Sequence, residues 1–154
     1  MTQSIETILD AARRHCAEDI APNVDAWNAA AVWPRAASDK AGALGLTGLY
    51  APEEFGGQGL PLGEGIRVYE ELGRGDGAYA FALSMHNICT FAGCGYGTDA
   101  FKAAWAKELT SGRKLANFAL TEPQSGSDAT NMYSRAVIND NGTWTINGAK
   151  AWVS

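Results

Sequence analysis

The chain has 154 residues, a length that fits one domain or one domain with part of a second. Hydrophobic residues make up 46% of it and charged residues 19%, a globular composition that excludes a disordered chain. The formal net charge is −5 and the basic residues are scattered, which argues against nucleic acid and against an anionic membrane as partners.

Apolar residues at helical spacing predict a first helix that ends before Pro22: Ile5, Ile8, Leu9, Ala12, Cys16 and Ile20. A short second helix is expected around residues 23–29, and a third begins near Pro34. Glycine and proline mark a loop over residues 48–63, after which helical spacing returns over residues 62–72.

Residues 77–97 carry no charged side chain, and Asp76 can cap a helix there. A transmembrane span and a helix buried on all sides both fit this stretch. Polar side chains in its middle, including His86 and Asn87, favour the buried helix. Whether His86 and Asn87 are hydrogen-bonded core groups or border a pocket stays open at this point.

The next helix is expected to begin at Thr98 or Asp99 and to end at Ser111-Gly112. Its inward stripe is predicted to be Phe101, Trp105 and Leu109. Residues 1–114 are therefore expected to form an all-α N-terminal domain.

Strand-like sequence follows over residues 115–154. We predict strands at Leu115–Thr121, at two runs joined by Asp140-Asn141-Gly142, and at Ala149–Ser154. Asn-Gly between two such runs predicts a hairpin turn with both residues at positive φ. So few strands cannot close a barrel. The predicted fold is mainly α, an all-α domain followed by the first strands of a truncated antiparallel β-barrel.

Few residues are spaced along the sequence as the members of a catalytic or metal-binding site would be. His15 and His86 lie far apart, and no Cys, His or Asp cluster has metal-ligand spacing, so we expect no metal site. The three cysteines are an odd number without a CxxC pair, which favours reduced thiols. The N-terminus lacks the basic start and apolar core of a signal peptide. Together these features predict a cytoplasmic protein.

The segment Ser125-Gly126-Ser127 follows the first predicted strand. Backbone N–H groups around a glycine, with hydroxyls beside them, can hold a phosphate. The same residues are also common in turns that bind nothing. Trp144 and Trp152 lie on neighbouring predicted strands, where packing is their simplest explanation.

Two blocks resemble those of the acyl-CoA dehydrogenase family. Phe118–Asp128 (FALTEPQSGSD) resembles its Thr-Glu-Pro-x-x-Gly-Ser-Asp signature, and Ile146–Ser154 (INGAKAWVS) resembles its Asn-Gly-x-Lys-x-Trp block. The order and spacing of the blocks match the family, and the loop Ala51–Gly57 fits as well. The resemblance implies the family's N-terminal helical domain over residues 1–114. It also implies the beginning of its middle, FAD-binding β-domain, left incomplete, over residues 115–154.

The resemblance implies FAD as the cofactor, and it implies that five residues lie along the flavin ring. Phe118, Leu120 and Thr121 would lie beside the ring, with Thr121 hydrogen-bonded to its polar edge. Trp152 would cover the ring, and Ser154 would place a hydroxyl near its reactive nitrogen. Phe118 stands where many relatives have tyrosine, which removes one hydroxyl near the ring.

Other positions are implied to serve the phosphates and the substrate. Gly126 and Ser127 would hold the pyrophosphate of FAD, and Ser127 would also border the bound thioester. The uncharged helix around His86 to Cys94 would line the acyl-chain cavity. Glu122 would have a structural role beside the flavin loop.

The implied activity is that of an FAD-dependent oxidoreductase of fatty acid metabolism, which dehydrogenates an acyl-CoA thioester between its α and β carbons. The implied partners are acyl-CoA and an electron-transfer flavoprotein, and the full-length enzyme would be a tetramer. The catalytic carboxylate is expected in a C-terminal helical domain outside this chain, so we assign no catalytic residue and expect the chain alone to be inactive. Two alternatives remain: a related acyl-CoA oxidase or flavin monooxygenase-like enzyme, and a non-catalytic helical binding or assembly module.

Overall fold

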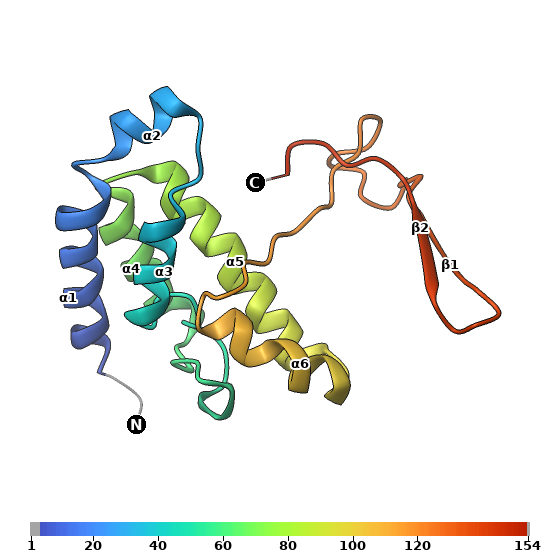
Figure 1. Ribbon diagram of the computed structural model, residues 1–154, viewed down its shortest axis with the longest axis horizontal. Helices are drawn as coiled ribbons and strands as arrows, with labels where there is room; N and C mark the ends of the chain where they lie inside the picture. The colour runs from blue at the N-terminus through green and yellow to red at the C-terminus, as the bar shows by residue number, and fades with distance from the viewer. Residues whose placement is uncertain (1–3, 154) are drawn as a thin grey trace. The chain divides into compact units, whose positions relative to one another are not determined.

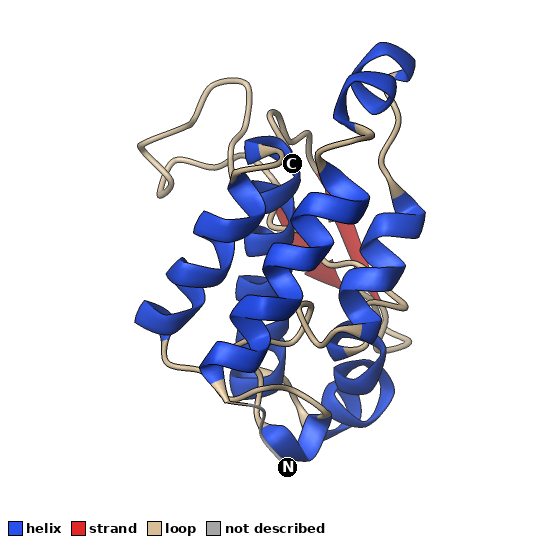
Figure 2. Cartoon of the chain, turned by 90° about the vertical axis from the view of Figure 1, so that its left-hand side faces the viewer, coloured by secondary structure: helices blue, strands red, loops and turns tan. Residues whose placement is uncertain are grey.

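The computed structural model describes residues 4–153, and the chain divides into two compact units, residues 1–116 and 117–154. Within the described residues, the first unit contains six α-helices and the second a two-stranded sheet. Figure 2 shows the helices in blue and the strands in red. This confirms the predicted mainly-α class, with a helical N-terminal part followed by antiparallel strands.

The first helix, α1 (Ile5–His15), begins at Ser4, whose side chain accepts a hydrogen bond from the Thr7 N–H. It continues into a π-helical turn, η1 (Cys16–Ile20). Ile8, Leu9 and Ile20 are buried, as their spacing predicts. Three short elements follow: α2 (Val24–Ala30), α3 (Arg35–Ala43) and the 3₁₀ turn η2 (Glu53–Phe55).

The core of the first unit is built on three longer helices, α4 (Leu62–Gly73), α5 (Gly77–Tyr96) and α6 (Asp99–Thr110). In Figure 1, α1 packs beside α4, α4 beside α5, and α5 beside α6. Fully buried aliphatic side chains fill the space between these elements, among them Leu9, Leu46, Val68, Leu72 and Leu83. Burial of this apolar surface is the main stabilising contribution to the unit.

The helix α5 begins where it was predicted, because the Asp76 carboxylate accepts from the N–H groups of Ala78 and Tyr79. The prediction that it is buried on all sides is wrong: Phe81 is 53% exposed and Ile88 44% exposed. Its buried side combines apolar residues such as Leu83 with the polar His86, Asn87 and Thr90, a mixture that composition alone does not reveal. Across the described residues, no helix is both long and apolar enough to cross a membrane.

The stripe predicted for α6 is only partly correct. Leu109 is buried, but Phe101 and Trp105 are 37% and 45% exposed, and Ala106 takes the fully buried position instead. Phe101 lies close against Gly93 and Gly97 of α5 and its C-cap, where a Cβ would stand 2.7 Å from the Phe101 ring. The two glycines leave room for the Phe101 ring to pack against α5, although the ring stays partly exposed.

The second unit contains a hairpin of β1 (Arg135–Ile138) and β2 (Trp144–Asn147), in antiparallel register with Val137 opposite Thr145. Within its turn, Gly142 alone has a positive φ, at 79°, so the predicted pair of positive-φ residues is wrong. The Gly142 N–H donates to the Asn139 carbonyl, and Asn139 N–H to the Thr143 carbonyl. This is a three-residue turn, in which one left-handed residue is sufficient.

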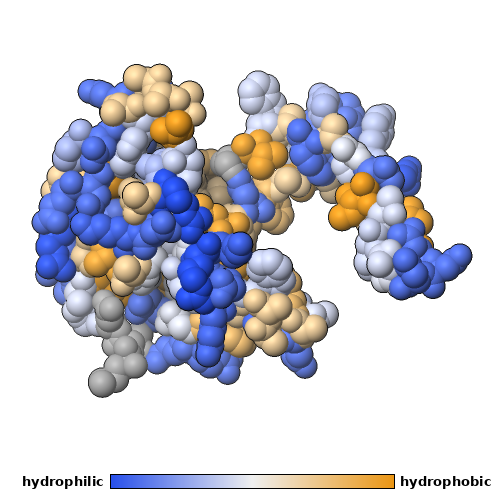
Figure 3. All heavy atoms as spheres, in the orientation of Figure 1, coloured by the Kyte–Doolittle hydropathy of each residue, from blue (hydrophilic) through white to orange (hydrophobic). Residues whose placement is uncertain are grey.

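The strands predicted at residues 115–121 and 149–154 are not present in the described part of the chain. Only the Ala151 N–H, which donates to the Thr121 carbonyl at 2.8 Å, links the two segments as a strand pair would. A single bond of this kind does not make a ladder. The hairpin also exposes the apolar side chains of Ile138 and Ile146. Figure 3 shows orange, hydrophobic surface on this part of the chain.

Candidate functional site

The buried carboxylate of Glu122 organises the loop that contains the first sequence block. Glu122 is 3% exposed. Its oxygens accept from the N–H of Tyr133 at 2.6 Å, the N–H of Ser134 at 3.0 Å and the side-chain amide of Gln124 at 2.6 Å. Lys150 completes the set with an ion pair at 2.9 Å. This carboxylate therefore has a structural position, as the resemblance implied.

The same contacts fix the charge of Glu122. Hydrogen bonds from Ser134 and Lys150 hold the pKa of this carboxyl far below its ordinary range. Burial acts in the opposite direction and is outweighed. Glu122 is ionised at neutral pH, and its oxygens are occupied by donors, so it is a poor candidate for a general base.

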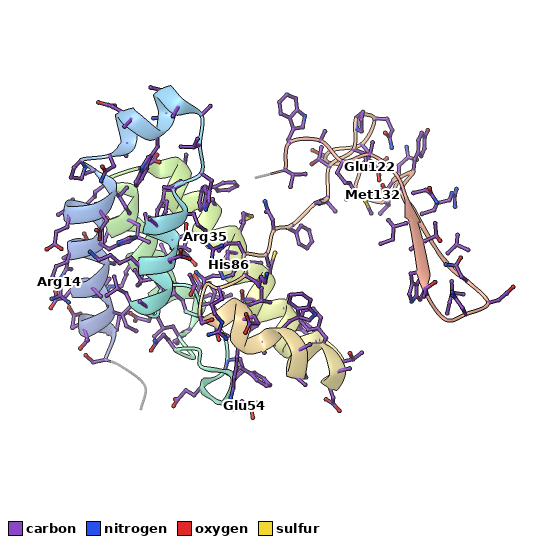
Figure 4. All side chains as sticks on the ribbon, viewed as in Figure 1. Arg14, Arg35, Glu54, His86, Glu122 and Met132 are labelled. Carbon is purple, nitrogen blue, oxygen red and sulfur yellow. The ribbon has the colours of Figure 1, made fainter. Side chains whose placement is uncertain are left out.

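Lys150 joins the two sequence blocks. Its ammonium donates to the Leu120 carbonyl at 3.0 Å and to Glu122 at 2.9 Å, and lies 3.4 Å from the sulfur of Met132. Glu122 and Met132 are labelled close together in Figure 4. With the Ala151–Thr121 backbone bond, these contacts bring residues 120–122 and 150–151 side by side.

The loop after Glu122 presents free donors to the surface. Ser125 is buried, and its hydroxyl donates to the Asp128 carbonyl, which tightens the turn. Gly126 and Ser127 are exposed, and no described residue accepts from their backbone N–H groups or pairs with the Ser127 hydroxyl. A Cβ built at Gly126 would meet no atom within 4 Å. This open group of donors fits a phosphate group.

The residues expected along a flavin ring have different exposures. Phe118 is 58% exposed, Leu120 39% exposed and Thr121 half-buried. Trp152 is 91% exposed and has a φ of 56°, a left-handed conformation that costs a bulky residue about 1–3 kcal/mol. Ser154 lies outside the described residues. The apolar side chains and the Thr121 N–H and hydroxyl, which have no described partner, fit an aromatic ring with polar edges.

In the first unit, His86 and Asn87 are core groups. The His86 Nδ1 accepts from the Ala116 N–H at 3.0 Å, so the Nε2, 3.1 Å from the Leu109 carbonyl, must carry the proton. Burial lowers the pKa of His86, which favours this neutral form. Asn87 is hydrogen-bonded to three backbone groups of the core. Of the two interpretations left open by the sequence, the structure supports core groups.

Sequence reasoning assigned no role to two side chains that hold several contacts in the structure. Lys150 stands in the second block, but its carboxylate partner is 28 residues away. His15 is fully buried, with Nδ1 2.8 Å from an Asp19 oxygen and Nε2 3.0 Å from the Tyr79 hydroxyl. Burial alone would raise the pKa of Asp19, but hydrogen bonds from Lys40 and His15 lower it. The one sequence signal for Lys150 was its position in the second block, and no sequence signal pointed to His15.

Comparison with known proteins gives two family matches. Residues 2–113 match the model of the acyl-CoA dehydrogenase N-terminal domain, and residues 117–154 match that of the acyl-CoA dehydrogenase middle domain. The (2S)-methylsuccinyl-CoA dehydrogenase of Cereibacter sphaeroides is 36% identical, over 100% of this chain and 28% of its own length.

Solved structures agree with these matches. Butyryl-CoA dehydrogenase from Megasphaera elsdenii gives a TM-score of 0.87 at 32% identity, over 99% of this chain and 41% of the other. A glutaryl-CoA dehydrogenase from Mycobacterium smegmatis, in complex with FADH2, gives a TM-score of 0.88 at 28% identity, over 99% of this chain and 39% of the other. The chain thus spans between 28% and 41% of these three proteins.

Proposed function

The chain belongs to the acyl-CoA dehydrogenase family, and from that premise we propose that it provides the front part of the FAD site of an acyl-CoA dehydrogenase. One observation carries the proposal: the two blocks with all the candidate flavin contacts are joined to each other. The Ala151 N–H donates to the Thr121 carbonyl at 2.8 Å, and Lys150 reaches the Leu120 carbonyl at 3.0 Å. A module kept only for assembly has no need of this arrangement, so that alternative is not favoured.

In the proposed enzyme, FAD supplies the acceptor for the hydride that leaves the β carbon of the acyl-CoA. Thr121 donates hydrogen bonds to the edge of the flavin ring that gains charge. Phe118 and Leu120 cover apolar surface and exclude water. Gly126 and Ser127 hold the pyrophosphate through their N–H groups and hydroxyl, and Ser127 also borders the thioester.

The α-proton requires a base, and Glu122, the carboxylate beside the flavin loop, does not suit that role. The Glu122 carboxylate is buried and occupied by four hydrogen-bond donors. We therefore propose that the base belongs to another part of the enzyme. The acyl chain is proposed to face the exposed side of α5, which carries Phe81 and Ile88, rather than the buried His86.

The wider assignments follow from the same family. We propose acyl-CoA as the substrate class, a role in fatty acid metabolism, an electron-transfer flavoprotein as electron acceptor, and a tetrameric enzyme. A cytoplasmic location suits the three free thiols of the chain. An acyl-CoA oxidase would share all the residues named here and would differ in its reaction with oxygen.

The test is a titration of the full-length protein with FAD. We expect binding with a flavin absorption band at about 450 nm, and bleaching of that band by an acyl-CoA under anaerobic conditions. Ser127→Ala should weaken FAD binding, whereas Thr143→Ala, in the hairpin turn, should not. A protein that is folded but takes up no FAD would refute the proposal.

A further inference from the structure

We propose that Glu122 and Lys150 are positioning residues for the flavin site, and that their ion pair holds the segment so that the N–H and hydroxyl of Thr121 stay free for the cofactor. The inference rests on the proposed function. Neither side chain needs to touch FAD, because both act through the backbone of the segment between Phe118 and Glu122.

The carbonyl groups at the C-terminal end of this segment, from Leu120 to Glu122, are already occupied. The Leu120 carbonyl accepts from the Lys150 ammonium at 3.0 Å, and the Thr121 carbonyl accepts from the Ala151 N–H at 2.8 Å. No described residue pairs with the Thr121 N–H or its hydroxyl. Around Thr121 the chain therefore presents free donors, while the neighbouring carbonyl groups are already taken. Such an edge suits a ring that gains negative charge as it is reduced.

Glu122 fixes the other end of the segment. Its carboxylate accepts from the backbone N–H groups of Tyr133 and Ser134, which lead directly into β1. Those contacts and the ion pair with Lys150 tie the loop to two separate parts of the unit. Lys150 is itself only partly exposed, with 25% of its side-chain surface accessible, so solvent screens the pair incompletely.

Removing either partner has a defined consequence. Lys150→Met deletes the donor to the Leu120 carbonyl and leaves the Glu122 carboxylate buried without its cation. Glu122→Gln keeps the shape but turns one accepting oxygen into a donor, which cannot satisfy the Tyr133 and Ser134 N–H groups together with Lys150. In both variants the segment can turn its carbonyl groups toward the cofactor.

The experiment compares FAD affinity in the full-length protein and four variants. Glu122→Gln and Lys150→Met should weaken FAD binding by about tenfold or more, because each breaks charge-assisted hydrogen bonds. At saturating FAD both should also shift the visible flavin spectrum, since the ring edge loses ordered donors. Lys150→Arg keeps the positive charge, so its FAD affinity should lie between that of these two variants and that of the natural protein.

The matched control is Asn139→Ala, which removes hydrogen bonds to Thr143 and Thr145 in the hairpin of the same unit. It lowers the stability of the unit without touching the loop, so its FAD affinity and flavin spectrum should be unchanged. Equal affinity in the natural protein and both ion-pair variants would overturn this inference alone. So would an equal loss in Asn139→Ala, which would assign the effect to general stability. Failure of the natural protein to bind FAD would overturn the proposed function as well.

Discussion

Replacing Asn87 with alanine should leave two buried backbone groups without partners. The Asn87 side chain accepts from the Leu49 N–H at 2.9 Å and donates to the Leu46 carbonyl at 2.8 Å, and both leucines are fully buried. Each unsatisfied buried group costs about 1–3 kcal/mol. We therefore expect Asn87→Ala to lower the free energy of unfolding by about 2–6 kcal/mol, a large part of the stability of an ordinary domain.

Urea denaturation followed by far-UV circular dichroism measures this change. With an m-value of about 2 kcal/mol/M, the midpoint should fall by about 1–3 M. Ser84→Ala is the control on the same helix: its hydroxyl donates to the Phe81 carbonyl near the surface, so its loss should stay within about 0.5 kcal/mol. Hydrogen exchange of the Leu49 amide should accelerate in Asn87→Ala. A variant no less stable than Ser84→Ala would refute the reasoning, because the two groups would then have found other partners.

Two further predictions concern protonation. Burial lowers the pKa of His86, so its ring should stay neutral, with the proton on Nε2, at pH values below the ordinary pKa of about 6.5. Nitrogen NMR chemical shifts across a pH titration measure this, and a charged ring at pH about 6.5 would contradict it. Because the pKa of Glu122 is lowered in the folded state, its contribution to stability is complete above the unfolded value of about 4.3 and is lost as the pH falls below it. The stability difference between the natural protein and Glu122→Gln, measured by exchange of the Ser134 amide, should therefore shrink on acidification; a constant difference down to pH 3 would contradict the assigned shift.

Local signals in the sequence were sufficient for most of the helices. The helix that begins after Asp76 and the stop at Pro22 depend on neighbouring residues, so the chain itself specifies them. The hairpin follows from two strand-like runs around Gly142, although its turn differs from the predicted type. The family follows from two short blocks whose residues can be read directly.

Tertiary structure decided which faces are buried and which charges meet. Phe101 was expected on the buried stripe of α6 but is 37% exposed, and Ala106 takes the fully buried position, because the packing of α6 against its neighbours decides which of its faces is covered. Glu122 and Lys150 are 28 residues apart, and nothing local to either residue indicates that they pair. Periodicity and capping depend on neighbours in sequence, so sequence alone determined the helices and the family. Side-chain burial and ion pairing depend on neighbours in space, which only the folded chain brings together.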